Sequence, residues 1–127
     1  MKNCTLNITT TVDGIATSIQ RNGQASLTPI SAHIIYKEEN AVVEITLSEG
    51  LLHIERRGDY TQSMYFCERK RMTGKLGIGG ADGEIHTHTD ALSFSLSETA
   101  LLLSMHYVLL IGDEPQNMKI RLFVKLT

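Results

Sequence analysis

The chain has 127 residues, a net charge of −2 at neutral pH and two cysteines, Cys4 and Cys67. This length suits one domain with its own hydrophobic core. The charge creates no strong field for nucleic acid or an anionic membrane, and so few cysteines argue against a disulfide-stapled secreted domain. We therefore expect a single domain over residues 1–127, with both cysteines as free thiols.

The sequence contains neither a recognisable signal peptide nor a membrane-spanning segment, and these two absences predict where in the cell the protein is located. The N-terminal segment has a lysine but no apolar stretch of the kind found in a signal peptide. The longest apolar run, residues 100–111, is interrupted by Ser104 and His106. It is also shorter than the roughly 20 residues of a membrane-spanning helix. The sequence therefore predicts a cytoplasmic protein with no membrane partner.

Apolar and polar residues alternate along most of the chain, which is the pattern of half-buried β-strands. Turn residues such as Asp13–Gly14 and Glu49–Gly50 separate the alternating segments. The last segment alternates most regularly and should point Ile120, Leu122 and Val124 inward. In chain order, we expect strands at residues 4–12, 15–19, 25–28, 33–36, 41–48, 51–57, 63–68, 84–89, 92–96 and 118–126.

Three segments are harder to interpret from the pattern. Residues 21–24 suggest a turn or bulge because they contain Asn22–Gly23. Residues 74–83 are glycine-rich and should hold at most one irregular strand. Residues 97–111 fit either a buried helix capped by Ser97 or a long strand. Their neighbours are strands, so we favour the strand. Eight to ten strands without helical crossovers predict a β-barrel or sandwich.

A motif between residues 57 and 66 adds to this pattern: an arginine and a glycine are followed by Gln-x-Met-x-Phe. With this motif the chain resembles the YwiB-like family of small bacterial proteins of unknown function. The resemblance extends from the Asp13–Gly14 turn to the last strand. The matching residues are Arg57, Gly58, Gln62, Met64, Phe66, Thr89 and Tyr107.

The resemblance implies a calycin-like, lipocalin-shaped β-barrel. We therefore expect an all-β fold with a single antiparallel barrel of eight to ten strands. The family has no agreed activity, and a fold does not determine a function. Barrels of this size either hold one small ligand or are filled by side chains, and the sequence leaves both alternatives open.

Basic residues concentrate near the motif, although the whole chain is slightly acidic. One hypothesis is that Arg57, Arg69 and Arg71 form an anion-attracting rim at one end of the barrel, because arginine binds carboxylate or phosphate with two hydrogen bonds. The alternative, which the pattern favours, is an ordinary solvated hairpin. Gln62 either closes that end of the barrel with Arg57, which we favour, or faces a ligand. Tyr107 completes the candidate ligand-binding residues.

Histidines provide a weaker candidate for a metal site. His86 and His88 are two residues apart on a predicted strand, so their side chains share a face. Asp90 extends that face, and His106 is able to join from the next strand. Such a set has the residue types of a zinc site. The alternative, which we favour, is a solvated polar face.

Motifs for catalysis and cofactor binding are missing from the sequence. The glycine-rich segment lacks the spacing of a phosphate-binding loop and has no following helix. No nucleophile elbow is present, and Cys67 lies within a predicted strand. We therefore expect no cofactor, and the sequence supports an enzyme only weakly.

The leading functional hypothesis is a β-barrel that binds a small or anionic ligand at its mouth. The first alternative is a protein-interaction or structural module with a side-chain-filled barrel, for which a homodimer is one arrangement. The second alternative is a metal-dependent enzyme. A nucleic-acid partner is disfavoured, because the chain has no tryptophan and few aromatic residues near its basic segment.

Overall fold

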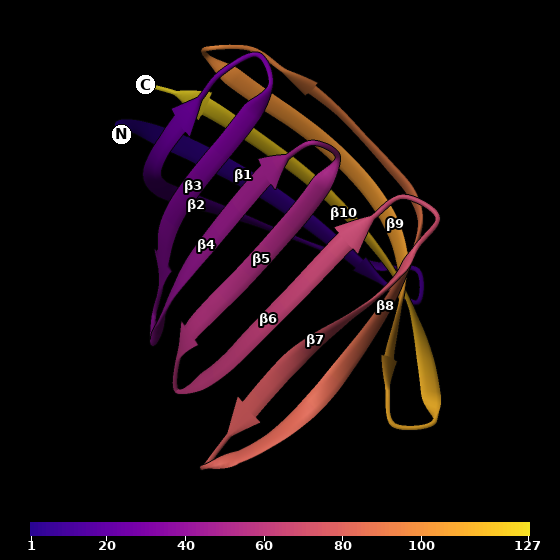
Figure 1. Ribbon diagram of the computed structural model, residues 1–127. Helices are drawn as coiled ribbons and strands as arrows, with labels where there is room; N and C mark the ends of the chain where they lie inside the picture. The colour runs from indigo at the N-terminus through magenta and orange to yellow at the C-terminus, as the bar shows by residue number, and fades with distance from the viewer.

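A computed structural model describes all 127 residues and contains ten strands and no helix. Each strand runs antiparallel to the next, and β1 pairs with β10 to close the barrel (Figure 1). This confirms the expected all-β fold with a single antiparallel barrel. No helix with the length and apolar composition for crossing a membrane is present. The strands are β1 (Lys2–Val12), β2 (Ile15–Leu27), β3 (Ser31–Glu38), β4 (Ala41–Ser48), β5 (Leu51–Gly58), β6 (Tyr60–Cys67), β7 (Arg71–Ile78), β8 (Ala81–Leu96), β9 (Ala100–Ile111) and β10 (Glu114–Leu126).

Successive hairpins place the turns alternately at the two ends of the barrel. The turns β1–β2, β3–β4, β5–β6, β7–β8 and β9–β10 share one end, which we call the mouth. The other four turns and both termini share the opposite end, which we call the closed end. The two termini lie close together in Figure 1, beside the β2–β3 connection.

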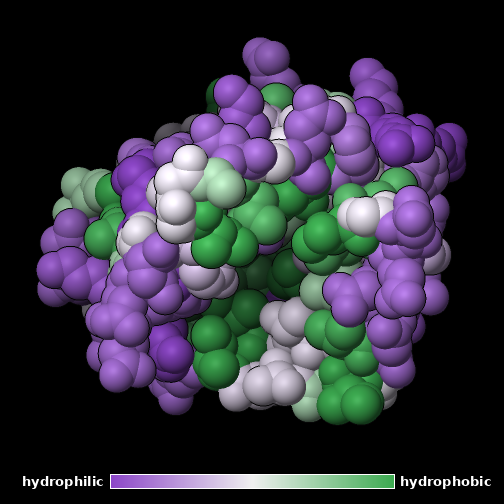
Figure 2. All heavy atoms as spheres, turned by 90° about the horizontal axis from the view of Figure 1, so that it is seen from below, coloured by the Kyte–Doolittle hydropathy of each residue, from purple (hydrophilic) through white to green (hydrophobic).

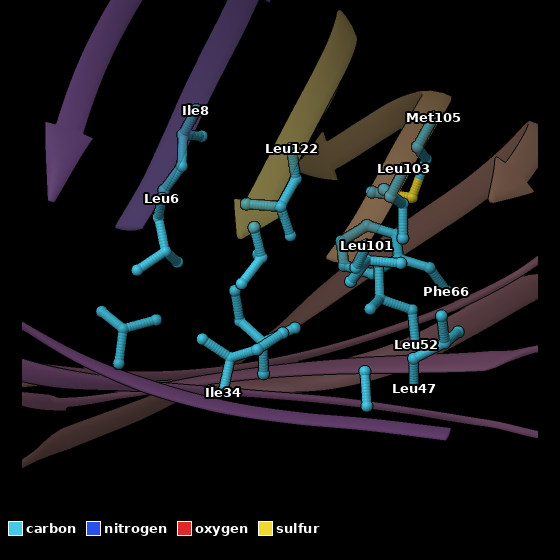
Figure 3. Packing of buried hydrophobic residues seen from close by; sticks show 14 of the residues in the cluster. Leu6, Ile8, Ile34, Leu47, Leu52, Phe66, Leu101, Leu103, Met105 and Leu122 are labelled. Carbon is cyan, nitrogen blue, oxygen red and sulfur yellow. The ribbon is translucent and has the colours of Figure 1, made fainter. Parts of the chain in front are cut away.

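The core occupies the closed-end half of the barrel. Side chains from opposite walls of the barrel meet there, and Figure 3 shows their packing. The most deeply buried of them, such as Leu6, Ile34 and Phe66, are at most 1% exposed. The predicted alternation in β10 is confirmed, since Leu122 and Val124 are buried while Lys119 and Lys125 are exposed. The filled half is formed by Leu6, Ile34, Leu47, Phe66, Leu101 and Val124, among others.

Residues 21–24 do not form the predicted turn or bulge but lie within the continuous strand β2. The reason is the position of Gly23, which pairs with Cys4 on one side and Tyr36 on the other. A Cβ atom on Gly23 would lie 2.5 Å from the carbonyl oxygen of Ile35. The glycine therefore permits a close approach of β3 and does not reverse the chain.

The glycine-rich segment also contains more regular structure than predicted. Strand β7 continues to Ile78, and β8 begins at Ala81 after a tight turn. Gly79 and Gly80 form that turn with φ values of 58° and 83°, which glycine adopts easily. The two strands expected at 84–89 and 92–96 are a single strand with a β-bulge between Thr89 and Ala91.

The segment with two interpretations is a strand, as favoured from its neighbours. Strand β9 begins at Ala100. The hydroxyl of Ser97 does accept hydrogen bonds from backbone N–H groups, those of Thr99 and Ala100 at 3.3 and 3.1 Å. It stabilises the β8–β9 turn in this way and caps no helix.

The two cysteines are free, as expected. Cys4 is buried in the closed-end half and Cys67 is half-buried in the barrel wall. Burial raises the pKa of the Cys4 thiol. Cys4 therefore acts as a small apolar residue of the core.

Candidate functional site

The mouth half of the barrel is hollow. A cavity of about 380 Å³ opens there, and Figure 2 shows it from the mouth as a depression with hydrophobic walls inside a hydrophilic surround. Eleven of its fourteen lining residues are apolar. The lining residues are Ile8, Thr10, Ile19, Tyr36, Glu38, Ile45, Leu52, Ile54, Tyr60, Gln62, Met64, Leu103, Ile120 and Leu122.

The cavity ends at a packed floor halfway along the barrel. Ile45, Leu52, Leu103 and Leu122 line it from four strands and are at most 3% exposed. Beyond them the interior is occupied by the core of the closed end. The barrel is therefore filled in one half and hollow in the other, so its depth suits a small molecule and not a long chain.

Arg56 organises one side of the mouth. Leu52 and Ile54 of β5 point into the barrel, and Arg56 is the next residue of the strand on the same face. Its guanidinium therefore lies at the rim of the mouth. One nitrogen donates to Oδ1 of Asp59 at 2.8 Å and another to the Tyr60 carbonyl oxygen at 2.8 Å. The guanidinium carbon lies 3.7 Å from the centre of the Tyr60 ring, a cation–π contact.

The same guanidinium connects two turns of the mouth. Its Nε donates to Oε2 of Glu38 on β3 at 3.3 Å, while its other contacts hold the β5–β6 turn. The hydrogen bond from Arg56 lowers the pKa of Asp59. Two carboxylates thus face one guanidinium. Arg21 on β2 is a second positive charge near Tyr36, so the charges of the rim balance.

Polar groups inside the mouth are few. The side-chain nitrogen of Gln62 has one weak partner, the sulfur of Met64 at 3.6 Å, so most of the amide is free to bond to a ligand. Burial, and then the charge of Glu38, raise the pKa of Tyr36 to about 12. Its phenol therefore stays protonated at neutral pH and able to donate a hydrogen bond.

Arg57, the arginine of the sequence motif, lies outside the barrel. Adjacent residues of a strand point to opposite faces, and here Arg56 takes the inner one. Arg57 forms ion pairs with Glu44 at 3.4 Å and Glu55 at 3.1 Å. The residue that faces Gln62 across the hairpin is Arg56. The expected closure by Arg57 and Gln62 is therefore not formed.

The expected common rim of three arginines does not form either. Arg57 precedes the β5–β6 turn at the mouth, whereas Arg69 lies in the β6–β7 turn and Arg71 begins β7, both at the closed end. The whole of β6 separates them. Arg69 adopts a φ of 64°, which the tight turn imposes on it.

Tyr107 is an interior residue and does not line the mouth cavity. It is 2% exposed, and its ring meets Phe66 edge-on with centroids 4.7 Å apart. Burial raises its pKa to about 12. Of the five residues predicted for ligand binding, only Gln62 lines the cavity.

The three candidate metal-binding histidines separate into two groups on the outer face. His88 and His106 flank Asp90, with nitrogen–oxygen distances of 3.2 and 3.7 Å. His86 instead contacts Thr73, at 3.1 Å. The structure contains no group of three or more His, Cys, Asp or Glu side chains placed to hold a metal ion.

The rim residues Tyr36, Glu38, Arg56 and Tyr60 were not identified from the sequence. One signal was present for Arg56, since Leu52 and Ile54 predict that the next even-numbered residue of the strand also faces inward. Glu38 comes from another hairpin, and the register of the barrel alone brings it to Arg56.

Comparison with known proteins gives a family and a fold. A family model described as "Domain of unknown function (DUF1934)" matches residues 5–122. The crystal structure of the ywiB protein from Bacillus subtilis is similar over 99% of this chain and 92% of that one, with a TM-score of 0.87 and 17% sequence identity. No protein with a curated description matches.

Proposed function

Since the chain belongs to the DUF1934 family, whose description assigns no activity, we propose from its geometry that it binds a small, largely apolar and uncharged molecule in the mouth of the barrel. The observation that supports this proposal is the open cavity of about 380 Å³ with mostly apolar walls. Its volume lies within the range of roughly 300–1,000 Å³ typical of small-molecule sites.

The chemistry of the lining suggests how the molecule is oriented. Apolar parts would contact Ile54, Leu103 and Ile120, and a hydrogen-bonding group would meet the amide of Gln62 near the rim. An anionic group is disfavoured, because the charges of Glu38 and Asp59 balance those of Arg56 and Arg21 and leave no net attraction to offset the cost of burying a charge. We therefore favour a neutral ligand over the anionic one considered from the sequence.

A fluorescent probe tests this proposal. The chain has no tryptophan, so the emission of 1-aminoanthracene, a neutral apolar amine, can be followed with little background. We expect its fluorescence to rise on binding and decanol to displace it. Decanoate should compete about tenfold more weakly, which corresponds to roughly 1.4 kcal/mol. Decanoate competing better than decanol would contradict a neutral ligand.

Two tryptophan variants locate the binding. Ile54→Trp places a large ring in the cavity, whereas Leu102→Trp places the same ring on the outer face, where Leu102 is 47% exposed. We expect the first variant to abolish probe binding and the second to leave it unchanged. Ile120→Trp repeats the test from the opposite wall if Ile54→Trp does not fold. No binding to the unmodified protein, or equal binding to all variants, would overturn the proposal and favour an interaction module.

A further inference from the structure

The outer face formed by β2, β1, β10 and β9 has an unusual charge distribution. Lys119, Arg121 and Lys125 point outward from β10, and none of them forms an ion pair. The outward positions of β1, β2 and β9, and those of β10 from Asn117 onward, contain no carboxylate. A protein with a net charge of −2 thus has one face on which only cations are charged.

This face is also hollowed. One depression of about 300 Å³ contains both Lys119 and Arg121, and a second of about 530 Å³ shares Lys119 and His106 with it. A third of about 260 Å³ shares Ser104 and Arg121 with the first. The three depressions adjoin one another across β1, β10, β9 and β8, and together we call them the outer groove. Their lining contains one carboxylate, Asp13, beside the β1–β2 turn.

The groove offers the donors that phosphate groups require. Lys119 and Arg121 are two residues apart on one strand face, about 7 Å along the chain, so each can meet a separate phosphate. The hydroxyl groups of Thr9 and Ser104 flank Arg121 as its partners on the neighbouring strands. Arginine, lysine and hydroxyl side chains make most protein contacts to phosphate oxygens.

An exposed aromatic side chain accompanies these cations. Phe123 lies between Arg121 and Lys125 on the same outward face of β10 and is 38% exposed. Leu102 lies beside Phe123 in the sheet. Aromatic rings next to a cationic groove are the platforms on which unpaired bases stack.

We propose that the outer groove binds single-stranded nucleic acid, with phosphates at Lys119 and Arg121 and a base stacked against Phe123. The sequence argues against a nucleic-acid partner through its whole-chain charge, but the fold separates the charges and leaves this face cationic. His106 contributes less, because Asp90 lies 3.7 Å from it. The proposal is independent of the mouth cavity, which opens inside the barrel.

Fluorescence anisotropy with a labelled oligouridylate of about 12 nucleotides tests the proposal. We expect binding at about 50 mM salt that weakens on the order of tenfold at about 200 mM, as two to three phosphate contacts imply. Arg121→Glu and Lys119→Glu should each reduce affinity at least about tenfold. The matched control is Lys37→Glu, an exposed lysine on β3 with the same change of charge.

Phe123→Ala separates stacking from charge. It should weaken binding of the oligonucleotide several-fold without changing the salt dependence, because it removes a platform and no charge. Equal loss in Lys37→Glu and Arg121→Glu would show a general effect of charge and overturn the proposal. Equal affinity for inorganic phosphate and the oligonucleotide would overturn it in favour of a site for a single anion, and so would the absence of binding at low salt.

Discussion

Two buried threonines on β8, Thr87 and Thr89, lie where β6 and β7 separate in the wall of the barrel. β6 pairs with β7 only from Tyr60 to Ser63, so the later part of β6 lacks a ladder partner on that side. Thr87 substitutes for that partner, since its hydroxyl donates to the Tyr65 carbonyl oxygen at 2.8 Å. Thr89 is equally buried, but its hydroxyl has no hydrogen-bond partner within the protein.

The same substitution at these two positions should therefore have opposite consequences. Thr87→Val leaves the Tyr65 carbonyl oxygen without its donor and should lower the free energy of unfolding by about 1–3 kcal/mol. Thr89→Val removes an unpaired hydroxyl and should be neutral or stabilising. Urea denaturation of both variants measures the difference. A Thr89→Val variant as unstable as Thr87→Val would show that the Thr89 hydroxyl has a partner, such as a buried water.

At the scale of the strands, one glycine determines how closely β6 and β7 approach. A Cβ atom on Gly74 would lie 1.9 Å from the carbonyl oxygen of Ser63. Nothing lies within 4 Å of the corresponding position on Gly83, in the neighbouring strand. The sequence shows both as members of one glycine-rich segment, and the contacts alone distinguish them.

Alanine substitution at the two glycines tests this distinction. Gly74→Ala forces backbone atoms apart and should cost at least about 1–3 kcal/mol, as overpacked sites do. Gly83→Ala meets open space without a positive φ and should change stability by less than about 1 kcal/mol. Thermal unfolding of the two variants provides the comparison. Similar melting temperatures would mean that β7 can move away from β6 at little cost.

At the scale of the whole molecule, local sequence patterns predicted the positions of most strands. They predicted less well how the strands pack against one another. The alternation from Met118 to Leu126 identified the inward face of β10, because burial of one sheet face dictates a period of two. The turn expected at Asn22–Gly23 was wrong, because a glycine that permits close packing has the same local signature as one that permits a turn. Only the pairing of Gly23 with Tyr36 on β3, more than ten residues later in the sequence, distinguishes the two roles.

The candidate site was less predictable for a related reason. Tyr36, Arg56 and Gln62 come from three strands, and the register of the closed barrel places them at one opening. The motif drew attention to Arg57, whose neighbour Arg56 occupies the inner face. Whether a barrel is hollow depends on the sum of many inward side chains, so no single motif predicts the cavity.

The central claim is that the hollow mouth of a half-filled barrel is a binding site, and a methyl NMR titration with decanol tests it most directly. We predict shifts of the methyl groups of Ile54, Leu103 and Ile120, which line the cavity. The methyl groups of Leu51 and Leu102, which are exposed on the outside of the barrel, should not move. Unchanged cavity methyl groups at saturating decanol, or shifts confined to Leu51 and Leu102, would contradict the account.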